Sequence, residues 1–368
     1  MTAQNTMQPL FYQRDFSGEI LPLPGLRWSV ERYSFATIGG PDRLTLKATG
    51  RPVSLWELVE TLRCPIEIFD PIGRCVWWGL AQKVTLRDGR FEFGADLSGM
   101  NNRVAVAYSY VEPGAQLVGQ RKTTAYAADA EAAGEYGYKD LQVSLGGATD
   151  AQALQVRGTV LAQNRLPNAW LRRAGGQGAT QATIEGVGWW KTLEWRMLKV
   201  TTTNNVATTT QIANAITAVG SFFAGTDIET ASGISTSEYR DGDTTALAEI
   251  EELLRSGTSG QQRLMASVTR ERRVVIKAEP TLGSADYTLD RRGRVRDESG
   301  NRLINALCPA GLWMRVTEVI PGSADISKLA QPGVFFVESA EYTPKTNEYL
   351  PTPRGAPTPW DIIRRFVK

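Results

Sequence analysis

The chain has 368 residues, with 41 lysines and arginines against 39 acids, and it contains no histidine. This length predicts about two to three domains with a sizeable core, and the net charge of +2 provides no general attraction to nucleic acid or to an anionic membrane. The lack of histidine excludes Ser-His-Asp and Cys-His catalysis, together with every metal site that needs an imidazole.

The three cysteines, Cys64, Cys75 and Cys308, form no Cys-x-x-Cys pair. Their odd number favours isolated buried thiols over a disulfide framework or a zinc site. No apolar run approaches the ~18 residues that cross a bilayer, so no membrane-spanning segment is expected. No signal-peptide pattern is visible at the N-terminus. We therefore expect a protein that is synthesised in a cytoplasm and is not exported by the secretory route.

Residues 26 to about 111 consist of short runs rich in β-branched and aromatic residues, separated by the turn signals GGPD, DPIG and RDG. One helix interrupts these strands at SLWELVETLR, where Ser54 and Glu57 have the spacing of a capping box. Leu55, Leu58 and Leu62 lie on one face of that helix. The pattern predicts a first β domain over residues 1–112, a barrel or sandwich of about six or seven strands with one helix.

The composition changes after this block. Residues 113–168 are rich in alanine and predict a helical linker, with a short strand-like LQVSL between its two helices. Strand patterns return in residues 169–200 and 300–345, which we assign to a second β domain. Between them, residues 201–299 predict an α/β insertion with two helices, TTTQIANAITAVG and one that Asp243 caps. The chain ends in a proline-rich docking tail, residues 346–368.

Three aromatic doublets stand out as candidate core or interface residues: Trp77, Trp78, Trp189, Trp190, Phe335 and Phe336. Neighbouring residues on a strand point to opposite faces, so a doublet needs cover on both sides of the sheet. Burying one tryptophan removes ~150–250 Å² of surface from water, which is a strong reason for such cover. An internal helix and a neighbouring subunit are equally good candidates for the second layer.

No arrangement of residues indicates an enzyme. Asp70, Asp96, Glu185 and Glu194 fall near strand ends, but no spacing ties any two of them together. No metal, cofactor or catalytic site is therefore predicted. A basic segment favours a solvated or subunit-facing charged surface over a nucleic-acid site, since no aromatic series is interleaved with it. Its eight basic residues are Arg270, Arg272, Arg273, Lys277, Arg291, Arg292, Arg294 and Arg296.

The chain resembles the hub protein of bacteriophage tails, which joins the end of the tail tube to the tip or spike. Three segments resemble the first barrel of this family: FATIGGPDRLTLKATG, LWELVETLRCPIEIFDPIGRCVWWGLAQKVTL and GADLSGMNNRVAVAYS. Its linker resembles TTAYAADAEAAGEYGYKDLQVSL, and its inserted domain resembles TTTQIANAITAVGSFFAGTDIE and EYRDGDTTALAEIEELLRSGT. The resemblance covers most of residues 25–280 and fades in the last ~60.

This resemblance implies an α+β fold with two tail-tube-like β-barrel domains carrying helical and α/β insertions. It implies a virion structural protein that forms a homotrimeric, pseudo-sixfold ring and is not an enzyme. The implied partners are the tail tube or distal tail protein above and tip, spike or fibre proteins below. Tape-measure protein and DNA would pass through the ring.

Two alternatives come from other functional classes. One is a peptidoglycan hydrolase of the tail tip, although no segment here matches such a domain. The other is a glycan- or receptor-binding module in which an outward tryptophan, Trp78 or Trp190, stacks on sugars.

The tail offers a candidate docking helix after its proline-rich part. WDIIRRFVK places Trp360, Ile363, Phe366 and Val367 among its apolar positions. Nine residues are too few to form a stable isolated helix in water, so this face must dock on another surface. That surface is either the chain's own second barrel or a neighbouring tip protein, and we favour the latter.

Overall fold

The fold is given by a computed structural model. It describes residues 7–112, 119–198, 201–220, 222–228, 234–240, 244–260, 262–281, 285–290, 294–297, 299–300, 311, 313–316 and 334–354. Cys308 and the four docking residues of the tail, Trp360, Ile363, Phe366 and Val367, lie outside these ranges.

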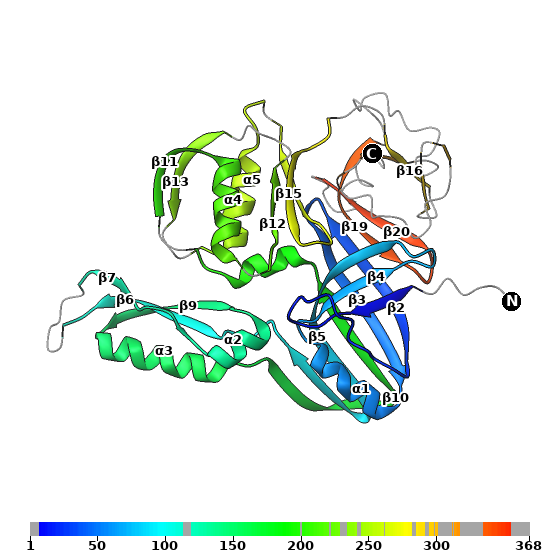
Figure 1. Cartoon of the computed structure of the whole chain (residues 1–368), viewed down its shortest axis with the longest axis horizontal. Helices are drawn as coiled ribbons and strands as arrows, with labels where there is room; N and C mark the ends of the chain where they lie inside the picture. Colours follow the sequence, from blue (N-terminus) through cyan, green and yellow to red (C-terminus); the bar gives the residue numbers. More distant parts are fainter. Residues whose placement is uncertain are drawn as a thin grey trace, which may run out of the picture.

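A large mixed sheet forms the main body, on the right of Figure 1. Its strand order is β1 (Gln8–Phe11), β4 (Pro65–Phe69), β5 (Cys75–Asp96), β10 (Asn168–Val187), β3 (Ile38–Gly50), β2 (Leu26–Ala36), β19 (Val334–Thr343), β18 (Trp313–Val316), β16 (Tyr287–Leu289) and β17 (Val295–Asp297). The α+β class is confirmed. Among the described strands no pair joins the two ends of this order, so the two-barrel arrangement stays a prediction.

Strand β5 turns back on itself at the lower end of this body. The Leu97 amide donates to the Gln82 carbonyl at 3.0 Å, whereas fifteen extended residues would span about 50 Å. Gly89, with φ +56°, lies at the turn, where residues with a Cβ are strained. Strand β10 follows both halves of β5, pairing Arg173 with Phe91 and Ile184 with Val84. This end of the sheet therefore presents a folded edge that helix α1 covers in part (Figure 1).

The helix expected at SLWELVETLR is present, but its cap is not the predicted one. Helix α1 (Pro52–Trp56) begins at a proline, and a 3-10 turn, η1 (Glu57–Thr61), follows it. Proline presets the helical φ of the first turn, so the helix starts before Ser54 and no side chain caps it. The apolar face is confirmed, since Leu55, Leu58 and Leu62 are buried in the core.

An α/β unit lies beside the main sheet, at the upper left of Figure 1. Helices α4 (Thr208–Val219) and α5 (Ala246–Ser256) contact each other there. Its strands are β11 (Thr201–Ala207), β13 (Ser235–Arg240), β12 (Gly225–Ile228), β14 (Leu264–Val268) and β15 (Arg273–Ala278). Thr245, not Asp243, caps α5 by accepting from the Ala248 amide; Asp243 lies outside the described residues. Strand β14 joins the unit to the main sheet by pairing with β3.

A third unit, at the lower left of Figure 1, contains residues of the predicted linker. Helices α2 (Ala130–Tyr136) and α3 (Asp150–Asn164) occur there as expected, and a capping box of Thr149 and Gln152 begins α3. The same region also forms strands β7 (Arg121–Thr123), β8 (Ala127–Ala128) and β9 (Asp140–Ala148). They pair with β6 (Arg103–Tyr110), so residues 113–168 are more than a helical connection. The predicted domain boundaries stay predictions.

The proline-rich tail begins inside the main sheet. Strand β20 (Glu348–Pro353) pairs with β19, and it lies at an edge, where proline is tolerated in a sheet. Tyr349 is buried and stacks on Tyr342 with ring centroids 4.7 Å apart. The first part of the predicted docking tail is therefore held by the chain itself, and only the residues after 354 are left as a docking segment.

Among the described residues, Trp77 is the largest side chain that is fully buried. Replacing Trp77 by Ala should lower the free energy of unfolding by about 3–5 kcal/mol, because it leaves a large cavity in the core. Ile72→Ala is the control, since 75% of that side chain is exposed, and it should change the free energy far less. Urea denaturation followed by circular dichroism measures both. Equal losses in the two variants would contradict the placement of Trp77.

Candidate functional site

The first doublet is covered by this chain completely on one face and in part on the other. Trp77 has no exposed surface, whereas Trp78 lies on the opposite face of β5. The Trp78 indole N–H donates to the Val268 carbonyl of β14 at 2.8 Å, and its ring meets Phe35 edge-on at 5.8 Å. The α/β unit thus supplies a layer over this part of the strand, so an internal element covers Trp78.

The second doublet lies in a 3-10 segment, η2 (Trp189–Trp195), that follows β10. Trp189 and Trp190 are both buried. A Cβ on Gly39, where φ is +106°, would come within 2.7 Å of Trp190, so a glycine is needed for this close approach. Segment η2 contacts β3, β14 and α5, so it joins the main sheet to the α/β unit.

The third doublet lies on β19. Phe336 is buried beneath the Arg354 guanidinium, which lies 4.2 Å from its ring centroid, and Phe335 packs partly against the core. Of the two tryptophans considered for stacking on sugars, Trp190 is buried and Trp78 is half-buried with its N–H already used.

The four carboxylates considered for catalysis serve separate local roles. Asp70 accepts from the Ile72 and Arg74 amides at 3.1 and 2.8 Å within a turn, and Asp96 accepts from the Ser98 amide at 2.7 Å. Glu185 pairs with Lys83 at 2.6 Å and Glu194 with Lys191 at 3.8 Å. Glu185 and Glu194 do line the same open groove, of about 500 Å³, over β2, β3 and β10.

The described ranges hold two cysteines, Cys64 and Cys75, and no histidine. No group of three or more His, Cys, Asp or Glu side chains there could hold a metal ion. Cys64 and Cys75 are free thiols, and burial raises the pKa of Cys75 to about 12. Of the helices in the described part of the chain, none is long and apolar enough to cross a membrane.

Most described members of the basic segment have partners within the chain. Arg270 binds both oxygens of Glu67 at 2.6 and 2.8 Å, and Arg273 binds Asp227. Arg294 pairs with Asp290. Arg291 and Arg292 lie outside the described residues. The members of the segment that the structure describes therefore do not form a free row of charges for phosphates.

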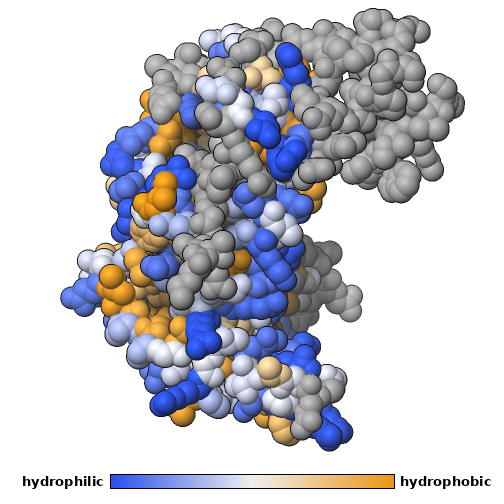
Figure 2. Space-filling view, turned by 90° about the vertical axis from the view of Figure 1, so that its right-hand side faces the viewer, coloured by the Kyte–Doolittle hydropathy of each residue, from blue (hydrophilic) through white to orange (hydrophobic). Residues whose placement is uncertain are grey.

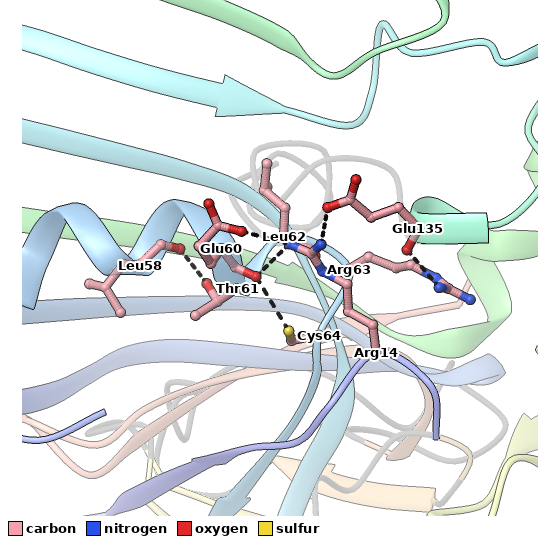
Figure 3. Close-up of polar contacts among 8 residues, drawn as sticks. All are labelled: Arg14, Leu58, Glu60, Thr61, Leu62, Arg63, Cys64 and Glu135. Atoms are coloured by element: carbon pink, nitrogen blue, oxygen red, sulfur yellow. Dashed lines mark hydrogen bonds and ion pairs between the residues drawn. The ribbon is translucent and has the colours of Figure 1, made fainter. Parts of the chain in front are cut away.

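A polar network ties the N-terminal arm and α2 to the segment between η1 and β4 (Figure 3). Arg14 forms an ion pair with Glu135 and donates to the Leu62 carbonyl at 2.8 Å. Arg63 donates to the Glu135 carbonyl at 2.8 Å. Arg63 is only 7% exposed, and burial lowers its pKa to about 10. Among the described residues no carboxylate lies within ion-pairing distance of Arg63.

A second ionic cluster joins the third unit to η2. The Asp140 carboxylate is fully buried and lies 2.9 Å from Nε of Arg103 and 3.3 Å from Nε of Arg196. It also accepts from the Met197 amide at 3.0 Å. The Arg103 guanidinium packs over the Tyr126 ring at 4.5 Å. Asp140 thus compensates two arginines whose side chains are largely buried.

An exposed apolar surface lies at the lower end of the main sheet, and no pattern in the sequence indicated it. Here α1, the turn of β5 and β10 come together, and they line a small apolar hollow with Trp56, Phe93 and Leu171. We call this the α1 surface. Its large apolar side chains, 49–72% exposed, are Val53, Trp56, Phe91 and Leu171. Figure 2 shows hydrophobic residues exposed among hydrophilic ones in the lower half of one face of the molecule.

Comparisons with known proteins found similarity among solved structures only. The 43 kDa tail protein of prophage MuSo2 from Shewanella oneidensis is 9% identical over 92% of each chain, with a TM-score of 0.41. A tail protein from Neisseria meningitidis MC58 is 7% identical over 94% of each chain, with a TM-score of 0.44. No family model and no curated protein matches the chain. These values are too low to assign the chain a role.

The Asp140 cluster gives a prediction for stability. Asp140→Asn should lower the free energy of unfolding by about 3–5 kcal/mol, because it leaves two buried guanidinium groups without their anion. Asp227→Asn removes an exposed partner of Arg273 and should cost at most about 1 kcal/mol. Chemical denaturation of both variants measures the difference. A loss in Asp140→Asn no larger than that in Asp227→Asn would show that the cluster is not a stabilising contact.

Proposed function

We propose that the chain is a structural protein of a bacteriophage tail, acting as the hub that connects the tail tube to the tip or spike. Three copies would form a pseudo-sixfold ring through which tape-measure protein and DNA pass. The resemblance of residues 25–280 to the hub family supports this role, and the sheet-rich α+β architecture agrees with it.

The observation that carries the proposal is the α1 surface. Soluble monomers rarely leave several large apolar side chains exposed together, because each forgoes the free energy of burial. Val53, Trp56, Phe91 and Leu171 are roughly half exposed or more at one end of the sheet. We assign this surface to the contact with a second copy of the chain, since a ring of identical subunits needs an apolar area on each of them.

The charged rim of the α1 surface suits such a contact. Arg172 and Glu92 pair across β10 and β5 beside the apolar side chains. Asp88 accepts from the Thr180 hydroxyl, while Arg87 donates to the Gly175 carbonyl. The rim therefore holds both signs of charge next to apolar residues, a composition that fits a polar rim around an apolar centre.

The tail after residue 354 is assigned to a tip, spike or fibre protein. The first part of the tail forms strand β20. The residues after 354 include the apolar positions of WDIIRRFVK. Truncation after residue 343 would remove β20, so a lost attachment could result either from a less stable fold or from the missing docking segment. Truncation after 354 keeps β20 and separates the two effects.

The assembly prediction uses Trp56 and Phe91. The double variant Trp56→Glu, Phe91→Glu should be monomeric, whereas the unmodified chain should form trimers, because two charges at the centre of an apolar contact oppose its burial. Multi-angle light scattering after size exclusion measures the mass, and circular dichroism checks that the variant is folded. Ile72→Glu, at a side chain that is 75% exposed elsewhere, is the matched control and should stay trimeric.

Two outcomes would contradict this proposal. An unmodified chain that is monomeric at every accessible concentration would remove the ring. A zone of clearing on peptidoglycan that Glu185→Gln abolishes would favour the hydrolase alternative.

A further inference from the structure

A second groove, of about 310 Å³, lies between the N-terminal arm, strands β4 and β5, segment η2 and the turn that joins β14 to β15. Its apolar wall contains Phe16, Pro65, Ile66, Trp78 and Trp189. Its charged residues are Glu67, Arg270 and Arg272. The groove therefore combines aromatic surface with two guanidinium groups and one carboxylate.

One of the two guanidinium groups is neutralised within the chain. Arg270 holds both oxygens of Glu67 in a bidentate pair, and the Tyr12 hydroxyl donates to the same carboxylate at 2.7 Å. Burial and the neighbouring Glu67 raise the pKa of Tyr12 to about 12, so the hydroxyl keeps its proton at neutral pH. Both oxygens of Glu67 are thereby engaged by Arg270 and Tyr12.

Arg272 has no such anion. Its guanidinium lies 3.9 Å from the centroid of the Phe16 ring, and its one hydrogen bond, to the Phe222 carbonyl, is long at 3.5 Å. No carboxylate in the described ranges lies within ion-pairing distance of it. Burial lowers the pKa of Arg272, as expected for a cation that is partly withdrawn from water without a counterion.

A second uncompensated cation lies behind the same ring. Arg63 packs 5.2 Å from the Phe16 centroid and 5.3 Å from that of Phe222. Its Nε has no hydrogen-bond partner although it is buried. Two guanidinium groups without carboxylates thus surround one aromatic side chain next to the groove. Their positive potential favours an anion from outside the chain.

We propose that this groove binds a carboxylate of a partner protein, held by Arg272 and accompanied by an apolar or aromatic side chain against Trp78 and Trp189. The lining charges, Arg270 and Arg272 against Glu67, leave a net charge of +1, which a monoanion balances. A phosphate dianion would exceed that charge and would lie close to Glu67. The carboxylate can belong to an acidic side chain or to a chain end. This site does not depend on the proposed role in a phage tail.

A matched pair of small probes tests the site with the full chain. N-acetylphenylalanine carries an aromatic ring and a carboxylate, and N-acetylphenylalaninamide differs only in lacking the charge. Isothermal titration calorimetry should show millimolar binding of the acid and binding of the amide that is weaker by about tenfold or more. Arg272→Gln should weaken binding of the acid by a similar factor and leave the amide unchanged.

Arg273→Gln is the matched control, because Arg273 pairs with Asp227 and does not line the groove. It should bind the acid as the unmodified chain does. Thermal unfolding of each variant checks that the fold is kept, and Arg272→Lys, which retains the charge, should bind better than Arg272→Gln. Equal binding of acid and amide, no binding of the acid, or full binding by Arg272→Gln would overturn the proposal. Tighter binding of inorganic phosphate than of the acid would overturn the assignment to a carboxylate.

Discussion

The structure depends on covering both faces of strands that carry large apolar side chains in succession. Trp77 and Trp78 lie next to each other on β5, so they project to opposite faces of the sheet. One face closes on the core of the main sheet, where Trp77 is fully buried. The other face needs a further layer, which Phe35 of β2 and the Val268 carbonyl of β14 provide against Trp78. The inserted α/β unit is therefore part of the main body's packing.

The same constraint explains why segments far apart in sequence are tied together. Segment η2 contacts α5, β14 and β3, and ionic contacts join the third unit at Asp140 and the N-terminal arm at Arg14. The lower end of the sheet is different, since no described element covers the exposed side chains of the α1 surface. A second copy of the chain bound there would bury these exposed side chains. The same need for burial that holds the subunit together would then also hold the ring together.

The sequence predicted those features that depend on local pattern. The periodicity of Leu55, Leu58 and Leu62 defined the buried face of one helix, although Pro52 rather than Ser54 set its start. The aromatic doublets indicated which segments need a packing layer on both sides, but not whether this chain or a neighbouring subunit provides the second layer. Arg272 was recognised only as one member of the basic segment, and Asp140 was not recognised at all. Their surroundings depend on contacts with Phe16 and with Arg103 and Arg196 that only the tertiary fold creates. The α1 surface was missed for the same reason, since Phe91 and Trp56 belong to different elements.

The contact between copies is tested most directly by an electron cryomicroscopy reconstruction of assembled particles that contain the chain. We predict three copies around the tail axis, with Val53, Trp56, Phe91 and Leu171 of each copy enclosed against its neighbour. A single copy on the axis, or a ring in which these four side chains face solvent, would contradict the assignment of the α1 surface.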